Sequence, residues 1–210
     1  MYTPKHFEMN DLPEAHAAMR AARTATLVTA TTEGLIGTPV PMLLDEAEGN
    51  FGTLYAHVAR ANAQWELPPT GDAMAIFNGP EAYITPSWYA TKQETHRVVP
   101  TWNYIAVHAY GPVEFFDDRD RLHSVVDRLT RYHEASRTAP WNVSDAPKRF
   151  VEAQLRGIVG VRMPISRVDA KSKMSQNRPA VDREGVVSGL ASSDAPQDQA
   201  VSELIPRDNS

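Results

Sequence analysis

The residues best suited to hold an anion follow a predicted β-strand. In residues 54–65, β-forming residues that include His57 lead into a predicted short helix at 60–67, with Arg60 and Asn62 at the junction. Free backbone N–H groups and the positive end of the helix dipole would then lie beside the Arg60 guanidinium, which suits a phosphate monoester. The structural alternative is an Arg60 ion pair and a partly buried His57, and it is the commoner role for isolated residues of these types.

Two further stretches place aromatic side chains beside small polar ones. They are residues 83–89 and 99–104, and the second contains Thr101, Trp102 and Asn103. Aromatic rings next to hydroxyl and amide groups can enclose a flat ring system and hydrogen-bond its edge. Packing in a core or an interface explains the same aromatic residues, and the sequence leaves both interpretations open.

Cationic residues alternate with amides and hydroxyls over residues 171–178. The members that could contact an anion are Lys173, Ser175, Gln176, Asn177 and Arg178. Taken alone, such a stretch is more often a solvated loop than a binding site. A metal site is not expected, because His123 and Asp127 are four residues apart on a predicted helix and supply only two ligands.

Composition excludes several classes of protein. The 210 residues contain no cysteine, which excludes disulfides, iron–sulfur clusters and thiolate zinc sites, and the nucleotide-binding, P-loop, zincin and α/β-hydrolase motifs are absent. The formal net charge is −5, so direct DNA contact is not expected. Neither a bilayer-spanning apolar run nor a signal-peptide pattern occurs, and we expect a cytoplasmic protein without membrane association.

The predicted elements are short strands with a few helices. Strands are expected at 25–31, 35–44, 51–58, 73–77, 81–85, 98–99, 104–116 and finally 158–163, with a turn at 78–80; helices are expected at 12–22, 118–135 and from about 145 to Gly157. Pro39 and Pro41 make the second strand an edge or bulged strand. This pattern favours a mainly β fold with helices, as in a small antiparallel barrel.

Five segments in order resemble the PaiB-type family of FMN-binding negative transcriptional regulators. The segments are residues 1–7, 57–62, 83–89, 99–104 and 173–178. The resemblance implies an antiparallel split β-barrel of the FMN-binding type, flanked by several helices, in which a homodimer holds FMN between its subunits. We expect one such domain over 1–191 and a loose polar tail over 192–210.

The resemblance also implies roles for the residues singled out above. His57, Arg60 and Asn62 would lie at the FMN phosphate, with Arg60 as its main ligand; Thr101, Trp102 and Asn103 would contact the ring or its edge; Lys173, Ser175, Gln176, Asn177 and Arg178 would close the groove. The implied function is that of a PaiB-type regulator, and no catalytic residue is assigned. A flavin-dependent oxidoreductase using NAD(P)H and, less favoured, a haem-binding split barrel remain open as alternatives.

Overall fold

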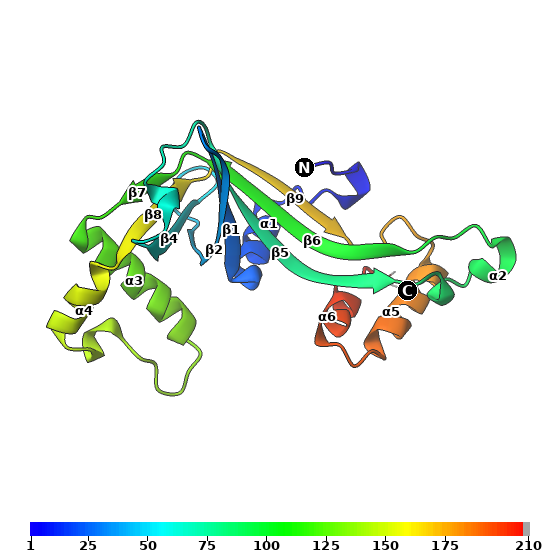
Figure 1. The fold of residues 1–210 in the computed structure, drawn as a ribbon. Coiled ribbons are helices and arrows are strands. Elements are labelled where there is room, and N and C mark those ends of the chain that lie inside the picture. Colours follow the sequence, from blue (N-terminus) through cyan, green and yellow to red (C-terminus); the bar gives the residue numbers. More distant parts are fainter. Residues whose placement is uncertain (208–210) are drawn as a thin grey trace. The chain divides into compact units, whose positions relative to one another are not determined.

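The chain folds as two compact units, which are described separately from a computed structural model that describes residues 1–207 (Figure 1). Unit 1 contains Met1–Ala18, Asn78–Val107 and the described residues from Asp169 onward, and unit 2 contains Met19–Phe77 and His108–Val168. The chain passes from one unit to the other within α1 (Leu12–Ala22), β5 (Ala73–Ile84), β6 (Thr101–Gly111) and β9 (Arg167–Lys173).

Antiparallel strands form the frame of unit 2. The remaining strands are β1 (Thr24–Thr31), β2 (Gly34–Pro41), β3 (Leu43–Asp45), β4 (Thr53–Ala59), β7 (Glu114–Phe116) and β8 (Ile158–Pro164). One sheet has the order β3-β4-β8-β7, and the other begins β2-β1-β5. The prediction of an edge strand at the two prolines is confirmed, because β2 lies at the end of its sheet and pairs along its length with β1. Neither strand order closes on itself.

Helix α3 (Arg119–Glu134) covers one face of the β3-β4-β8-β7 sheet (Figure 1). The side chain of Asp118 caps α3 by accepting a hydrogen bond from the backbone N–H of Arg121 at 2.9 Å. The apolar stripe of α3 packs with α4 (Lys148–Leu155) and the sheet around Leu43, Phe116, Leu122, Val125, Leu129 and Leu155. Short 3₁₀ turns, η2 (Ala63–Trp65) and η4 (Val143–Asp145), complete the unit.

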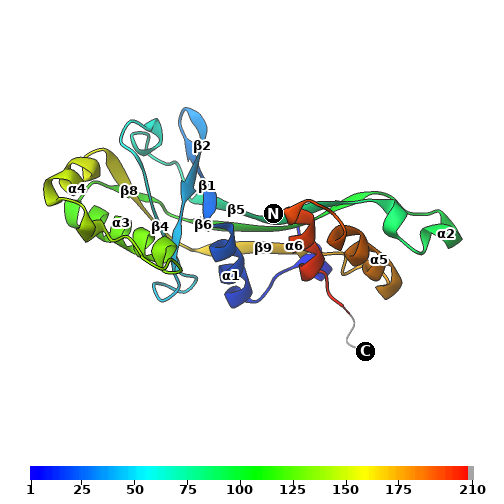
Figure 2. The ribbon, with the colours of Figure 1, turned by 90° about the horizontal axis from the view of Figure 1, so that it is seen from below.

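Unit 1 contains the parts of β5, β6 and β9 that are neighbours in that order, together with helices near the C-terminus. Its other elements are η1 (Lys5–Phe7), η3 (Pro86–Trp88), α2 (Lys92–Thr95), α5 (Ala180–Ala191) and α6 (Pro196–Leu204). Helices α5 and α6 lie side by side (Figure 2). The core of the unit is formed by Ala82, Ile84, Tyr89, Met174, Val186, Leu190, Val201 and Ile205.

Several local predictions need correction. The expected turn at 78–80 is wrong, because β5 runs through these residues without a break. Gly79 lies where two strands approach closely: a Cβ at this position would be 2.8 Å from the Cβ of Ile105. The glycine therefore allows close strand packing and does not form a turn. The expected strand at 98–99 is absent among the described residues. Strand 158–163 is not the last, since β9 follows β8.

The expected loose tail also differs from the structure. Residues 196–204 form α6, whose Val201 is fully buried, and Ile205 beyond it is 2% exposed. Burial of these apolar side chains against α5 offsets the entropy of ordering a polar segment. Residues 208–210 of the expected tail lie outside the described residues, and the single-domain boundary at 191 stays a prediction. None of the helices described is both long and apolar enough to cross a membrane.

Candidate functional site

Arg60 is fixed in unit 2 by neutral acceptors. Its Nε donates to the carbonyl oxygen of Arg156 at 2.8 Å, and Nη2 donates to the carbonyl oxygen of Ile158 at 3.2 Å. Nη1 lies 3.7 Å from a carboxylate oxygen of Asp117, whose side chain is 72% exposed. Carbonyl oxygens orient a guanidinium without cancelling its charge, and an exposed carboxylate screens it weakly. Arg60 therefore keeps both its positive charge and N–H groups for a further anion.

A cavity of about 470 Å³ opens beside Arg60. This Arg60 cavity is lined by Arg60, Asp117, Arg119, Leu122, Glu152, Leu155 and Arg156. Arg119 forms an ion pair with Glu152 in its wall. Three guanidinium groups and two carboxylates line the cavity, so a cationic wall with an apolar base formed by Leu122 and Leu155 is available to an anionic ligand.

Asn62 has a local structural role beside Arg60. Its Oδ1 accepts a hydrogen bond from the backbone N–H of Gln64 at 2.9 Å, and its Nδ2 donates to Thr38 Oγ1 at 3.0 Å. The predicted helix at 60–67 is wrong in extent, because only the three residues of η2 are helical. A single turn carries little dipole, so the positive charge of this segment is that of the Arg60 side chain.

His57 lies three residues before Arg60 on β4, opposite Gly160 of β8. Its Nδ1 is buried and has no hydrogen-bond partner within residues 1–207. Burial lowers the pKa of His57, so the imidazole is neutral at pH 7. A neutral imidazole has one nitrogen that accepts and one that donates, so His57 offers a hydrogen-bonding group that the protein itself does not satisfy.

Four of the predicted residues meet in unit 1, where the start of β6 lies beside the end of β9. Lys173 Nζ donates a hydrogen bond to Thr101 Oγ1. Asn103 Nδ2 donates to Ser175 Oγ at 3.0 Å, and both side chains are buried. Partial burial lowers the pKa of Lys173, and no carboxylate in the described part of the chain forms an ion pair with it. Asn103 and Ser175 thus bond each other, whereas Lys173 keeps N–H groups for a ligand.

The turn after β9 is held by its own side chains. Ser175 has a φ of 61°, and the Gln176 side chain accepts from the backbone N–H of Met174 and donates to the carbonyl oxygen of Ser172, both at 2.6 Å. Asn177 is exposed, and the guanidinium carbon of Arg178 lies 4.6 Å from the Tyr89 ring centroid. Gln176 therefore shapes the turn.

Trp102 is not brought together with Thr101 and Asn103. Successive strand residues point to opposite faces, and Trp102 is 51% exposed with its ring edge-on to Tyr83 at a centroid distance of 5.9 Å. Trp102 therefore lies on the opposite face of β6 from Thr101 and Asn103. Arg60, His57 and Asn62 belong to unit 2, and each group is described by itself.

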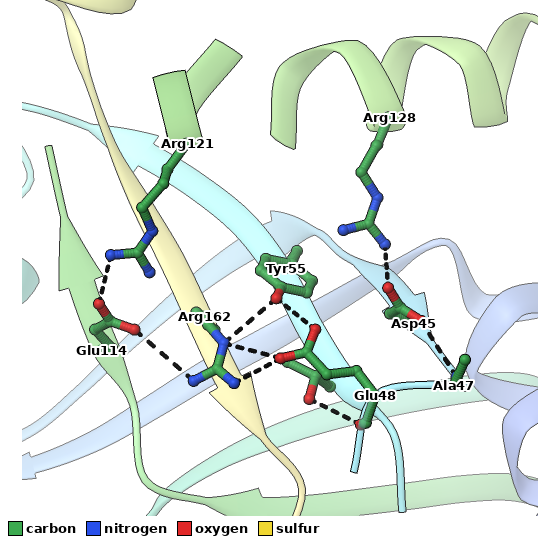
Figure 3. Close-up of polar contacts among 9 residues, drawn as sticks. Asp45, Ala47, Glu48, Tyr55, Glu114, Arg121, Arg128 and Arg162 are labelled. Atoms are coloured by element: carbon green, nitrogen blue, oxygen red, sulfur yellow. Dashed lines mark hydrogen bonds and ion pairs between the residues drawn. The ribbon is translucent and has the colours of Figure 1, made fainter. Parts of the chain in front are cut away.

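The sequence analysis missed several residues of unit 2. Arg119 and Arg156 line the Arg60 cavity, but they come from α3 and from the residue that follows α4, far along the chain. Glu48, Tyr55 and Arg162 form a hydrogen-bonded cluster that depends on the pairing of β4 with β8 (Figure 3). No local signal in the sequence marks either group.

A metal site finds no support in the described residues. They contain no cluster of three His, Asp or Glu side chains that could hold a metal ion. Asp127, which with His123 was weighed as a ligand pair, accepts an ion pair from Arg131 at 2.9 Å.

Comparisons with known proteins identify a family and several relatives of this chain. The family described as "Putative FMN-binding domain" matches residues 1–167. The protein named "Protease synthase and sporulation protein PAI 2" of Bacillus subtilis is 30% identical over 206 residues, which cover 98% of this chain and 96% of that protein.

Solved structures share the fold at low sequence identity. The flavocytochrome Anf3 from Azotobacter vinelandii has a TM-score of 0.57 and 12% identity, covering 81% of this chain and 72% of that chain. The FAD and heme binding protein from Mycobacterium smegmatis has a TM-score of 0.56 and 11% identity, covering 79% and 73%. The split-barrel fold class predicted from the sequence is confirmed by these similarities and by the antiparallel sheets with flanking helices.

Proposed function

The chain belongs to the family of FMN-binding split-barrel proteins that includes PAI 2 of Bacillus subtilis, and on that premise we propose that Arg60 receives the FMN phosphate in a homodimeric, PaiB-type regulator. The observation that carries this assignment is the way in which Arg60 is held. Two backbone carbonyl oxygens orient its guanidinium, and its charge remains for a ligand. A phosphate monoester carries close to two negative charges and accepts bidentate hydrogen bonds from a guanidinium.

The residues of unit 2 fit this group in two further respects. Arg119 and Arg156 add cationic side chains to the cavity wall, and Leu122 and Leu155 give it an apolar base. His57, three residues before Arg60, does not line the cavity, but its buried Nδ1 has no hydrogen-bond partner within the described residues. Arg60 would bind the phosphate, and His57 would bond a hydroxyl or ring atom of the ligand.

Unit 1 would contribute Lys173. Its ammonium is 6.0 Å from the ring centroids of Phe7 and Tyr104 and bonds Thr101, so a cation with adjacent aromatic faces is available to a flavin ring edge. Asn103, Ser175 and Gln176 would hold the turn that carries this lysine. In a homodimer, Lys173 and Arg178 of one subunit would complete the site of the other.

Bound FMN would supply redox and light-absorbing chemistry, and the protein would position it. We place regulation in a flavin-dependent protein contact. The net charge of −5 opposes direct DNA binding, because nucleic-acid affinity depends on neutralising phosphates with basic side chains.

A titration of the protein with FMN, followed by flavin fluorescence, tests the phosphate assignment. Arg60→Gln should weaken FMN binding about 10- to 100-fold, the value of one or two charge-assisted hydrogen bonds. Arg131→Gln is the matched control: it removes the same charge from a residue that forms an ion pair with Asp127 on α3, and it should bind FMN as the unaltered chain does. Equal affinity of Arg60→Gln and the control would show that Arg60 does not hold the phosphate.

The FMN-loaded protein also separates a regulator from an oxidoreductase. Anaerobic mixing with NADH or NADPH should leave the oxidised flavin spectrum unchanged on the timescale of turnover if the protein is a regulator. Rapid bleaching would favour the oxidoreductase.

Light scattering tests the homodimer. The molar mass, measured with and without FMN, should correspond to a dimer, and a monomer at saturating FMN would contradict the shared site.

A further inference from the structure

A second group of arginines in unit 2 surrounds a smaller cavity on another part of α3. This arginine pocket has a volume of about 210 Å³ and shares no lining residue with the Arg60 cavity. It is lined by Tyr55, Phe116, Arg121, Ser124, Val125, Arg128 and Arg162. Among the residues that the structure describes, none that lines this pocket carries a carboxylate.

Arg162 of β8 is fixed on the sheet side of the pocket. Its Nε and Nη2 donate to Glu48 Oε1 at 3.1 and 2.5 Å, and Nη1 lies 3.9 Å from Glu114. The Tyr55 hydroxyl donates to Glu48 Oε2 at 2.6 Å (Figure 3). Hydrogen bonds from Tyr55 and Arg162 lower the pKa of Glu48, so this carboxylate stays charged and holds Arg162 in one orientation.

Arg121 and Arg128 reach the same pocket from α3. Arg121 Nη1 donates to Glu114 Oε1 at 2.7 Å, and Arg128 Nη2 donates to Asp45 Oδ2 at 2.7 Å (Figure 3). The two arginines are seven residues apart, which places them on one face of the helix. Each is anchored by one nitrogen to a carboxylate that does not line the pocket.

Aromatic rings cover the flat faces of two of these guanidinium groups. The central carbon of Arg121 lies 3.9 Å from the Phe116 ring centroid, and that of Arg128 lies 4.9 Å from the Tyr55 ring centroid. A guanidinium has five N–H donors in its plane, and one bond to a carboxylate leaves the others for further acceptors. Stacking and anchoring therefore fix the direction of the remaining N–H groups while leaving them available.

The donors and the volume define the class of ligand. Three guanidinium groups, two from α3 and one from β8, and the Ser124 hydroxyl match an oxyanion with several acceptor atoms, and planar guanidinium groups bind phosphate oxygens in pairs. The volume lies below the range of about 300–1,000 Å³ typical of sites for drug-sized ligands, so a flavin nucleotide is too large. Val125 and Phe116 supply a small apolar surface for a short carbon chain.

We propose that the arginine pocket binds a small phosphate monoester, of the size of a three-carbon phosphate, through Arg121, Arg128, Arg162 and Ser124. This site is independent of the FMN assignment, since it uses none of the residues of the Arg60 cavity. Its occupation would link α3 to β8, because the four ligand-binding residues lie on these two elements.

Isothermal titration of the FMN-saturated protein with glycerol 3-phosphate tests the proposal, with inorganic phosphate as a second probe. FMN saturation removes competition for the Arg60 cavity, and the titration is repeated on Arg60→Gln without FMN so that the result does not depend on flavin binding. We expect one saturable site in both proteins. Arg128→Gln and Arg121→Gln should each weaken it at least about tenfold.

Ser124→Glu separates ligand binding from folding. A carboxylate at this exposed position would pair with Arg128 one helical turn later, so it should abolish phosphate binding without lowering the melting temperature. Arg131→Gln, on the same helix but outside the pocket, should bind the probe normally. Absence of saturable binding, or unchanged binding in Arg128→Gln and Ser124→Glu, would overturn the proposal. Equal affinity for malonate would overturn the assignment to a phosphate ester.

Discussion

The two cavities of unit 2 show two ways of presenting arginine side chains to a ligand. In the Arg60 cavity, backbone carbonyl oxygens position Arg60, and carboxylates of Asp117 and Glu152 lie in the wall. In the arginine pocket, each guanidinium bonds a carboxylate that does not line the pocket, and the lining itself includes no carboxylate within the described chain. Both cavities are lined in part by residues of α3.

The difference lies in where the balancing negative charge is placed. A carboxylate in the wall competes with an anionic ligand for the same N–H groups, whereas a carboxylate behind the guanidinium orients it and leaves its outer edge free. Among the three guanidinium groups of the Arg60 cavity, we expect the charge of Arg60 to matter most, whereas binding in the arginine pocket depends on the directions of several N–H groups. The predictions below test this contrast from the largest effect to the smallest.

Leu122→Ala should disturb both cavities at once. Leu122 is 2% exposed, lines the Arg60 cavity and packs α3 onto the sheet next to Val125, which lines the arginine pocket. Removing a buried leucine side chain costs about 2–5 kcal/mol of stability. Chemical denaturation should show this loss, with weaker binding of both FMN and phosphate. Loss of only one of the two ligands would show that α3 does not couple the cavities through its core face.

Glu48→Gln should lower the free energy of unfolding at neutral pH by about 1–2 kcal/mol. This value is smaller than that of a fully buried charged hydrogen bond, because the side chains of Glu48 and Arg162 are each about one third exposed to solvent. The folded-state pKa of Glu48 is depressed, so its contribution is present above the unfolded pKa of about 4.3 and is lost as the pH falls through the folded value. Denaturation at pH 7 and at pH 3 measures this difference.

The stability difference between the variant and the unaltered chain should therefore shrink as the pH falls below about 4.3 toward the lowered pKa of Glu48. Asp117→Asn is the matched comparison from the Arg60 cavity, because it also removes a carboxylate next to an arginine. The ion pair between the exposed Asp117 carboxylate and Arg60 should contribute less than about 1 kcal/mol to the free energy of unfolding at pH 7. A larger loss from Asp117→Asn than from Glu48→Gln would reverse the contrast between the two cavities.

The sequence predicted the elements whose signals are local. Helix α1 was predicted with its observed bounds, and apolar residues at three- and four-residue spacing located α3 to within a residue at each end. The Arg60 segment was found because it follows a recognisable strand.

Elements with weak local signals were missed. Strand β9 was missed because its sequence, RVDAKSK, has little apolar alternation. Helix α5 was missed because Gly185 and Gly189, which allow the close approach of Trp88, weaken the helical signal.

The rest of the candidate site could not be read locally. Tyr55 and Arg162 are separated by more than one hundred residues and meet only because β4 pairs with β8 in one register. Likewise, Asn103 and Ser175 hydrogen-bond each other between the start of β6 and the turn after β9, a contact that no local sequence signal marks. Pairing of distant strands sets these contacts, and composition carries no record of the register.

His57 provides a second and weaker pH dependence. Its pKa is lowered by burial, so the unfolded chain binds a proton more readily than the folded chain, and stability should fall as the pH drops from 7 to 5. Glu48 acts in a more acidic range, and the two effects are therefore separable. His57→Gln should flatten the curve of unfolding free energy between pH 7 and pH 5. An unchanged slope would show that another group titrates there.

If FMN hydrogen-bonds the neutral imidazole of His57, saturating FMN should make the unfolding free energy fall more steeply between pH 7 and pH 5. Binding to the neutral form lowers the histidine pKa further, so more stability is lost on protonation. Glycerol 3-phosphate, which we assign to the arginine pocket, should leave the slope unchanged. Histidine titration by NMR in the presence of each ligand provides the measurement. An equal response to both ligands would remove the distinction between the cavities.

The smallest effect should come from removing a carboxylate from the cavity wall. Asp117 Oδ2 lies 3.7 Å from Arg60 Nη1, so it opposes an anion that approaches the same edge of the guanidinium. Asp117→Asn keeps the shape and removes the charge, and it should increase FMN affinity about two- to fivefold at low salt, the range of an exposed pair. The gain should shrink at 0.5 M salt, where such charges are screened.

Asp45→Asn should act in the opposite direction on phosphate affinity in the arginine pocket. Asp45 accepts a hydrogen bond from Arg128 and so orients it, and the loss of this carboxylate frees the Arg128 side chain to rotate. If both substitutions increased affinity, net charge alone would govern the two sites, and the position of the carboxylate would not matter.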